Sequence, residues 1–202
     1  MTFENVTSKM IKKKYHHGDL ATSLVQAAVA LLREKGPASL SLRAVARVAG
    51  VSHGAPAHHF GDKTGLLTAV ATEGHDFLAE ALRKSQARKK TPMSRLAAAG
   101  KAYVKFAISQ PAYFSTMFQF DLLDCEDPGF VRASFLPKQI LEQCVRALEE
   151  NVSADERQIQ SMVISRWSQV HGFATLWMMG SFGSPDDSVL LEVLLSEMMA
   201  EA

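Results

Sequence analysis

Apolar residues recur at helical spacing along almost the whole of this 202-residue chain. The first run begins after Asp19, a residue that can cap a helix, and ends at Gly36-Pro37. Pro137 is expected to delay the regular part of a later helix. No alternation typical of β-strands occurs, so the pattern predicts an all-α protein of about nine helices. Ser41 can cap the second helix, which Gly50 ends, and Thr91-Pro92 starts a later one. After the first run, the expected helices cover about 42–49, 52–59, 63–88, 92–110, 111–118, 130–150, 154–179 and 185–199.

Residues 42–59 carry the most specific local pattern, which reads as helix, tight turn and second helix. The small side chain of Ala46 lets the second helix cross close to the first. Gly50 follows where a helix-ending turn often needs positive φ, and Val51 can fill the space between the helices. Ser52 can cap the second helix or reach a phosphate. In a helix-turn-helix, the residues that would face base edges are His53, Gly54, Ala55 and Ala57.

The formal net charge is only +1, but the charge is unevenly placed. Residues 1–63 hold nine basic and four acidic side chains, a net charge of +5, and the remainder has a net charge of −4. Five of the seven histidines also fall in the first part. A basic segment joined to an acidic body indicates nucleic-acid contact through one end. A solvated basic surface is the alternative.

Three segments within residues 15–70 occur in a characteristic order: KYHHGDL, GPASLSLRAVARVAGVS and HHFGDKTGLLTAV. As a set they resemble the DNA-binding region of the TetR/AcrR family of bacterial transcriptional regulators. The resemblance implies that Ser41 and Arg43 hold the DNA backbone, that His58 and Lys63 meet phosphates, and that Phe60 packs in the core. The residues it assigns to DNA contact are Ser41, Arg43, Ser52, His53, Gly54, Ala55, Ala57, His58 and Lys63.

Two positions depart from that family pattern. Ala57 stands where family members usually carry a Tyr that steadies the backbone contact, and Pro56 stands where Leu is more frequent. Proline is tolerated in the first turn of a helix because its missing N–H is nearly unpaired there. Ala57 lacks one hydroxyl and one ring, which affects the strength of DNA binding and not its location. His59 is expected at the surface or in packing.

The expected domains are a flexible basic arm over 1–14, a helix-turn-helix domain over 15–62 and a helical body over 63–202. In the arm, Lys9 and Lys12 to Lys14 can lie along phosphates or enter a minor groove. A disordered, solubilising tail is an equal alternative.

Several classes of protein are not expected. No run of about 18 apolar residues could span a membrane, and no apolar stretch follows the N-terminal basic residues as in a secretory signal. Two cysteines, Cys125 and Cys144, are too few for a disulfide scaffold, which favours a cytoplasmic location. Their thiols could sense oxidation or have no functional role. Since no phosphate loop, HExxH helix or GxSxG elbow occurs, we expect no enzyme activity, catalytic residue, cofactor or metal.

The body is rich in aromatic residues and Met at helical spacing, which is typical of a core and also of an apolar ligand cavity. Trp167-x3-His171-Gly172, together with AYVKFAISQPAYFSTMF, resembles the TetR subgroup marked by a Trp…His-Gly motif. Gly172 is expected to permit close helix approach. His171 is expected one turn from Trp167, as a hydrogen-bonded core residue or a ligand contact. The candidate ligand-binding residues are Tyr103, Phe106, Phe114, Met117, Phe118, Trp167, His171 and Met178.

The resemblance also implies a homodimer whose interface is a four-helix bundle of the last two helices of each chain. Their apolar residues exceed what one helix face needs. They include Met162, Val163, Leu190, Leu191, Val193, Leu194, Met198 and Met199. The expected function is a dimeric transcriptional regulator, a repressor that binds a palindromic operator in double-stranded DNA and is released by a small apolar effector. The alternatives are a DNA-binding dimer that senses no ligand and an all-helical enzyme.

Overall fold

The computed structural model describes residues 17–36, 39–148 and 153–200, and within these ranges it contains nine α-helices, one short 3-10 helix and no strand. The prediction of an all-α fold is therefore confirmed, while the predicted arm over 1–14 lies outside the described residues. In chain order the elements are α1 (His17–Lys35), α2 (Leu42–Ala49), α3 (Ala55–Phe60), α4 (Lys63–Gln86), α5 (Pro92–Ser109), α6 (Pro111–Met117), η2 (Phe120–Leu122), α7 (Pro128–Arg146), α8 (Glu156–Met178) and α9 (Ser188–Ala200).

Local capping residues set several of these boundaries. The Ser41 hydroxyl accepts a hydrogen bond from the Ala44 N–H at 3.2 Å and so caps α2. At the other end of α2, Gly50 adopts a left-handed conformation with φ of 67°, which Gly adopts without the steric cost of a side chain. Thr91 and Ser94 form a reciprocal capping box at the start of α5. These boundaries agree with the sequence pattern.

The second helix of the helix-turn-helix begins later than predicted. Ser52 does not cap it; instead, the Ser52 carbonyl accepts from the Ala55 N–H at 3.0 Å and closes a turn. Gly54 occupies the N-cap position, and no side chain caps the helix. The prediction of a helix from Ser52 is therefore wrong, because a turn of residues 52–55 precedes regular helix.

Proline placement also differs from expectation in the second half of the chain. The α7 helix begins at Pro128, where the Asp127 carboxylate accepts from the Phe130 N–H at 2.8 Å. Pro137 lies inside this helix and is buried, so it does not delay the helix as predicted. It costs one backbone hydrogen bond, to the carbonyl of Ala133, and helix packing outweighs that cost.

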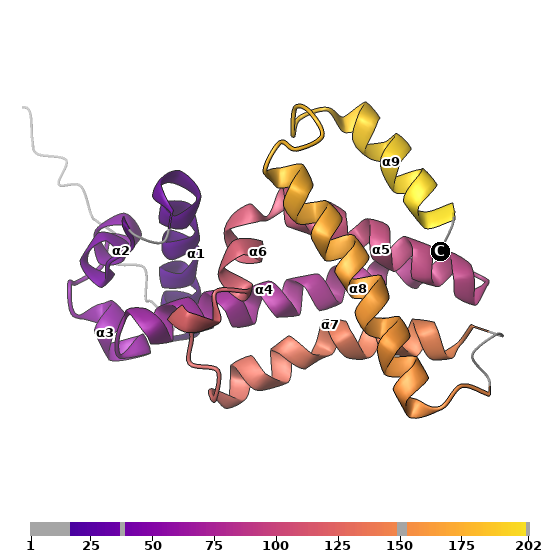
Figure 1. The fold of residues 1–202 in the computed structure, drawn as a ribbon. Coiled ribbons are helices and arrows are strands. Elements are labelled where there is room, and N and C mark those ends of the chain that lie inside the picture. Colours follow the sequence, from indigo (N-terminus) through magenta and orange to yellow (C-terminus); the bar gives the residue numbers. More distant parts are fainter. Residues whose placement is uncertain (1–16, 37–38, 149–152, 201–202) are drawn as a thin grey trace, which may run out of the picture.

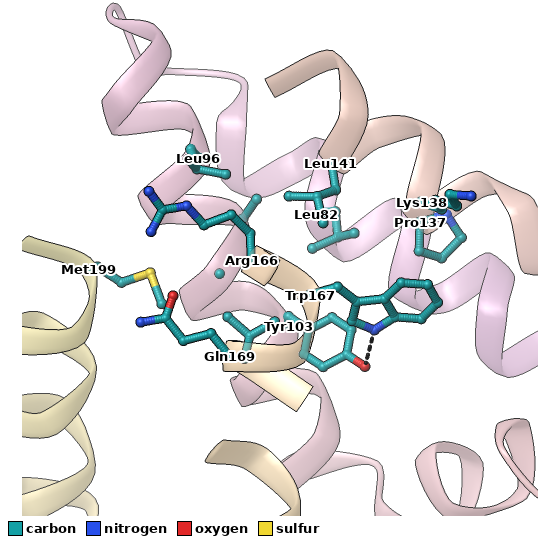
Figure 2. Close-up of a pocket in the computed structure, with 13 residues that line it drawn as sticks. Leu82, Leu96, Tyr103, Pro137, Lys138, Leu141, Arg166, Trp167, Gln169 and Met199 are labelled. Carbon is teal, nitrogen blue, oxygen red and sulfur yellow. Dashed lines mark hydrogen bonds between the residues drawn. The ribbon is translucent and has the colours of Figure 1, made fainter. Parts of the chain in front are cut away.

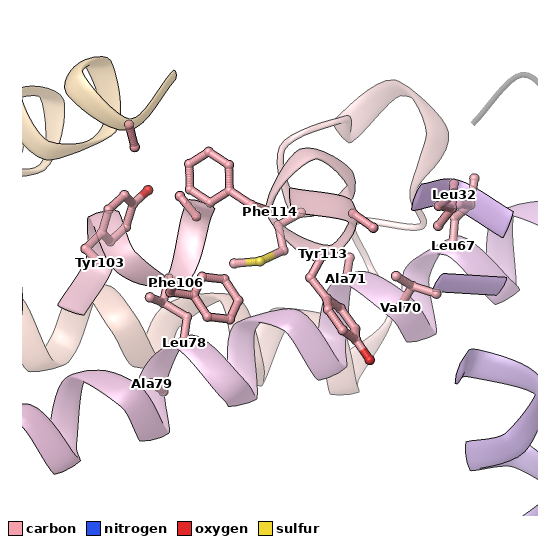
Figure 3. Close-up of a cluster of buried hydrophobic side chains, with 14 of the residues drawn as sticks. Leu32, Leu67, Val70, Ala71, Leu78, Ala79, Tyr103, Phe106, Tyr113 and Phe114 are labelled. Carbon is pink, nitrogen blue, oxygen red and sulfur yellow. The ribbon is translucent and has the colours of Figure 1, made fainter. Parts of the chain in front are cut away.

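The longest helix, α4, runs from the α1–α3 head at one end of the molecule across the whole body (Figure 1). One continuous apolar core follows it. Figure 3 shows Leu67 and Val70 of α4 beside α1, and Leu78 of the same helix farther along, near Phe106 of α5. Head and body thus share a single rigid element.

The last helix, α9, packs on the body through apolar side chains, with Leu191, Leu195 and Met199 in the main core, and through a few polar contacts. A Cβ added to Gly100 would meet the Met199 Sδ at 2.6 Å, so glycine allows this close approach. An ion pair joins Lys105 Nζ to Glu192 Oε1 at 2.6 Å. The Lys101 ammonium donates to the Ser196 hydroxyl at 3.1 Å. These contacts fix α9 over one end of the body.

Candidate functional site

The residues predicted to contact DNA lie on the head, on α2, α3 and the turns before and after them. Seven are exposed: Ser41, Arg43, Ser52, His53, Gly54, Ala57 and His58. The other two, Ala55 and Lys63, are half-buried. Eight of the nine lie on the α1–α3 head, and Lys63 is the first residue of α4, which follows it directly.

Tight packing holds α2 and α3 in their crossing geometry. Ala46 is fully buried at the crossing, and its carbonyl accepts from the Val51 N–H at 3.0 Å. Pro56, in the first turn of α3, is also buried. Phe60 is half-buried against the main core, in agreement with its predicted role. The exposed start of α3 therefore stands on a fixed base.

The junction of α3 and α4 depends on a glycine that the sequence pattern did not single out. Asp62 caps α4 by accepting from the Gly65 N–H at 2.9 Å. A Cβ at Gly65 would lie 2.0 Å from the Phe60 carbonyl oxygen, so no larger residue fits without moving backbone. Lys63, the first residue of α4, follows this cap directly.

A second candidate site lies in the body, where three polar groups meet among aromatic rings. The Trp167 indole N–H donates to the Tyr103 hydroxyl at 3.2 Å, and that hydroxyl lies 2.8 Å from His171 Nδ1. A hydroxyl has one hydrogen and two lone pairs, so the Tyr103 oxygen can accept from Trp167 and also pair with His171 Nδ1 in either tautomer of the histidine. Burial raises the pKa of Tyr103 and lowers the pKa of His171. Both groups therefore stay uncharged near neutral pH.

Two phenylalanines complete this aromatic cluster. The Phe114 and Phe118 rings lie 5.3 and 4.6 Å from the His171 ring, between centroids. Tyr103 meets Phe114 edge-on at 5.8 Å. Five of the eight predicted ligand residues thus come together, from α5, the end of α6 and α8.

A cavity, here called the α5–α8 cavity, lies behind Tyr103 and Trp167 (Figure 2). It encloses about 50 Å³, room for a few water molecules and far less than the roughly 300–1,000 Å³ of ordinary ligand pockets. An effector would have to move its walls. The lining residues are Leu82, Leu96, Ala99, Gly100, Tyr103, Pro137, Lys138, Leu141, Arg166, Trp167, Gln169, Val170 and Met199.

On the other side of Trp167 and His171 lies a surface hollow of about 250 Å³, here called the aromatic groove. Its lining is almost wholly apolar, and Phe120 and Ile164 at its mouth are 56% and 59% exposed. The groove residues are Phe118, Phe120, Ile164, Trp167, Ser168 and His171. The aromatic cluster thus lies between a small cavity and a larger, more open groove.

Three predicted ligand residues lie elsewhere. Phe106 is buried in the core and borders a different hollow, beside Phe77 and Lys105. Met117 is fully buried against Gly74 of α4. Met178 packs on the main core and lines neither the cavity nor the groove. Helical spacing identifies such residues as inward-facing, but it does not separate core from cavity wall.

Several cavity residues were missed by the sequence pattern. Leu82, Pro137 and Leu141 come from α4 and α7, and Gly100 and Met199 form the contact between α5 and α9. None carries a polar group that would distinguish it from an ordinary core residue. The clearest available signal was Gly100, a glycine inside a helical run.

Exposed apolar side chains gather on α8, α9 and the connection between them. Among those exposed are Ile164, Leu176, Met179, Phe182, Val189 and Val193. Three residues assigned to the dimer surface, Val163, Leu191 and Met199, are instead buried within the chain. Gly172 meets nothing within 4 Å of a Cβ, so the predicted close approach there is wrong within one chain. An apolar face nonetheless remains on these two helices.

Two findings bear on other kinds of site. Over residues 17–36, 39–148 and 153–200, no group of three or more His, Cys, Asp and Glu could hold a metal ion. Over those same ranges, no helix is long and apolar enough to cross a membrane.

Comparison with known families decides the assignment. The model described as "Tetracyclin repressor-like, C-terminal domain" matches residues 96–198, and the model "Bacterial regulatory proteins, tetR family" matches residues 24–70. The chain belongs to the TetR family. It is a DNA-binding transcriptional regulator of this family, whose members form dimers, and its family and fold are those of regulators and not of enzymes.

Individual relatives share either the helix-turn-helix segment or the fold of this chain. The chain is 48% identical over 47 residues to the HTH-type transcriptional regulator BetI of Proteus mirabilis (strain HI4320), a match that spans 23% of this chain and only 24% of that protein. A protein of unknown function from Rhodococcus sp. RHA1 has a TM-score of 0.77 at 27% identity, covering 94% of this chain and 98% of its own. The fatty acid degradation regulator FadR from Bacillus halodurans shares the fold, with a TM-score of 0.72 at 15% identity over 93% of this chain and 95% of its own.

Proposed function

We propose that this TetR-family protein is a ligand-responsive repressor that binds a palindromic operator as a homodimer and is released by a small apolar effector. The observation that carries the proposal is the course of α4. This helix begins at Lys63, beside the helix-turn-helix, and reaches Leu82 in the wall of the α5–α8 cavity. A change of cavity shape therefore acts on the element that holds the head.

In the proposed complex, the exposed start of α3 enters the major groove. His53, Gly54, Ala55 and Ala57 face base edges, while Ser52 lies at the edge of the groove. The phosphate contacts are assigned to Ser41, Arg43, His58 and Lys63, which flank that position. In domain terms, 15–62 is the DNA-binding unit, 63–202 the effector and dimer unit, and 1–14 an arm.

Dimerisation is assigned to the apolar face of α8 and α9. Met179 and Val189 are 74% and 75% exposed, and such a face is stable in water when a second subunit covers it. A two-fold dimer places its two recognition helices in successive major grooves, about 34–36 Å apart. A shift in the angle between subunits changes that spacing and releases the DNA.

The effector is assigned to the cavity and the aromatic groove around Tyr103, Trp167 and His171. Their hydrogen bonds form the polar part of an otherwise apolar site, as small-molecule sites are commonly built. The Trp…His-Gly spacing supports placement in the subgroup marked by that motif. We also propose a cytoplasmic location and no catalytic activity, since no catalytic or cofactor motif occurs in the sequence.

Selection of bound sequences from a random double-stranded DNA library tests this function. The expected product is a palindrome with half-sites about one helical turn apart. A mobility-shift titration then measures affinity for that site and for the DNA upstream of the gene. Absence of any selected sequence would refute operator binding, and a selected site without two-fold symmetry would refute the dimer arrangement.

A fluorescence titration tests effector binding separately. In a Trp177→Phe variant the signal comes from Trp167 alone, because the chain has two tryptophans. Trp177 donates to the Pro185 carbonyl at 3.1 Å, away from both candidate spaces. Small apolar compounds that quench Trp167 should also release the selected operator. Binding without release would support a DNA-binding dimer that senses no ligand at this site.

A further inference from the structure

His75, near the middle of α4, is a polar side chain buried in the body of the protein. Its side chain is only 5% exposed, and neither ring nitrogen has a hydrogen-bond partner among the residues that the structure describes. Buried polar groups without partners are rare, because each gives up its hydrogen bonds to water. A histidine in such a position is therefore a candidate for contact with a bound polar group.

The surroundings of His75 are apolar. The rings of Phe118 and Phe130 meet it edge-on, with centroids 6.2 and 5.7 Å away. Burial lowers the pKa of His75 to about 4, against the smaller effects of the Asp76 charge and of a contact with the Met117 backbone, which falls short of hydrogen-bond geometry. The ring is therefore neutral near pH 7, and a neutral imidazole offers one donor and one acceptor.

One side chain separates this imidazole from the aromatic groove. The Phe118 ring meets His171, a groove residue, at 4.6 Å and also meets His75 at 6.2 Å. Phe118 stands at the C-cap of the seven-residue helix α6, where regular structure ends. A rotation of Phe118 would bring the His75 ring next to the groove.

We propose that His75 anchors an uncharged, hydroxyl-bearing apolar compound that enters through the aromatic groove and displaces Phe118. This inference rests on the proposed effector response and specifies the chemistry of the effector. A hydroxyl both donates and accepts, which matches a neutral imidazole. A carboxylate does not fit, because it would lose its hydration among phenylalanines and lie close to Asp76.

A matched pair of probes tests the anchor: 4-ethylphenol, and 4-ethyltoluene, in which a methyl group replaces the hydroxyl. Their affinities are measured by calorimetry on the full chain. The wild type should prefer the phenol by about five- to tenfold, the net effect of one hydrogen bond. In His75→Phe the preference should reverse, because the phenol hydroxyl would then be buried unpaired. Phe118→Ala should tighten binding of both probes.

A second variant, His171→Phe, removes the imidazole that lines the groove; with His75 as the anchor, the preference for the phenol should persist even where the affinity for both probes changes. If the preference is lost in His171→Phe but kept in His75→Phe, His171 and not His75 is the anchor, and the proposal is overturned. Equal affinities in the wild type would also overturn it. Nitrogen NMR of the wild-type imidazoles gives a check independent of variant folding, since only 4-ethylphenol should shift the His75 signals.

Operator release is measured in the same samples, so that the two proposals can fail separately. Binding that depends on His75, without release of DNA, would retain the anchor and contradict the effector response. Release by compounds that show no dependence on His75 would retain the effector response and overturn the anchor.

Discussion

The Tyr113 hydroxyl joins the head to the body: it accepts from Gln26 Nε2 of α1 at 2.9 Å and donates to Glu73 Oε2 of α4 at 2.6 Å. Burial and the adjacent Glu73 carboxylate raise the pKa of Tyr113, so the hydroxyl keeps the proton that it donates. Tyr113 belongs to α6, and its neighbour Phe114 packs on His171. One short helix therefore contacts both the head and the aromatic cluster.

Tyr113→Phe should lower the free energy of unfolding by about 1–2 kcal/mol, because two hydrogen bonds are lost while the ring remains. It should also reduce the effect of effector on operator affinity. Urea denaturation and mobility shifts measure the two effects. The Gln26→Ala variant completes a double-mutant cycle, in which the pair should show a coupling of about 0.5 kcal/mol or more. Strict additivity would show that the Gln26 contact carries no energy.

Lys63→Ala and His53→Ala should separate affinity from specificity. Removing Lys63 should weaken binding to all DNA sequences and reduce the slope of log affinity against log salt by about 1. Removing His53, which is exposed before α3, should change which base is preferred at one operator position. Mobility shifts on single-base operator variants at several salt concentrations provide the measurement. A uniform loss for both variants would refute the division of roles.

Two glycines of the head should respond in opposite ways to substitution by Ala. In Gly65→Ala the Cβ would lie 2.0 Å from the Phe60 carbonyl oxygen, so backbone must move. We expect a loss of about 2–3 kcal/mol in stability and loss of operator binding, since α3 is displaced. Gly54 has φ of −82° and open space around it, and Gly54→Ala should be neutral or slightly stabilising. Equal thermal stability of the two variants would contradict this packing argument.

His75 should make the fold sensitive to acid. The pKa of His75 falls from 6.5 in an unfolded chain to about 4 in the fold, so the unfolded chain takes up the proton first as pH decreases. Above about pH 6.5 the ring is uncharged in both the folded and the unfolded chain, so His75 adds no pH dependence there. Between about pH 6.5 and pH 4 the free energy of unfolding falls by up to about 1.4 kcal/mol per pH unit.

His75→Phe should therefore flatten the dependence of unfolding free energy on pH between about 4 and 6.5. It should also stabilise the protein at pH 7, by about 1 kcal/mol or more, because two unpaired buried nitrogens are removed. His53→Phe, at an exposed position, is the control and should leave the curve close to that of the wild type. Identical curves for His75→Phe and wild type would show that His75 does not set the acid response.

Much of the fold could be predicted because its signals are local. Ser41, Gly50 and Thr91 act on backbone within a few residues of themselves, and each does what its position in the pattern suggests. The start of α3 was misplaced because Ser52 serves equally well in a turn or at a cap. Local chemistry fixes the kind of element and leaves such alternatives to tertiary packing.

The site was predicted less completely, and the reason is also physical. Trp167 and His171 could be paired because one helical turn separates them, but their shared partner Tyr103 lies on another helix. Gly65 and Gly100 matter through neighbours that the helical pattern does not reveal. The isolation of His75 likewise depends on Phe118 and Phe130, which follow it by more than 40 residues. Such properties arise only when distant segments pack.

Through the contact between Met199 and Gly100, α9 lies between the α5–α8 cavity and the proposed dimer surface. One face of α9 lines the α5–α8 cavity, while Val189 and Val193 on the same helix are exposed where a second subunit is proposed to bind. With the dimer surface proposed above, a compound that displaces Met199 should alter subunit association, and association should then alter its affinity by the same factor. Effector affinity should consequently vary with protein concentration, so that a scarce regulator and an abundant one respond to different amounts of the same compound.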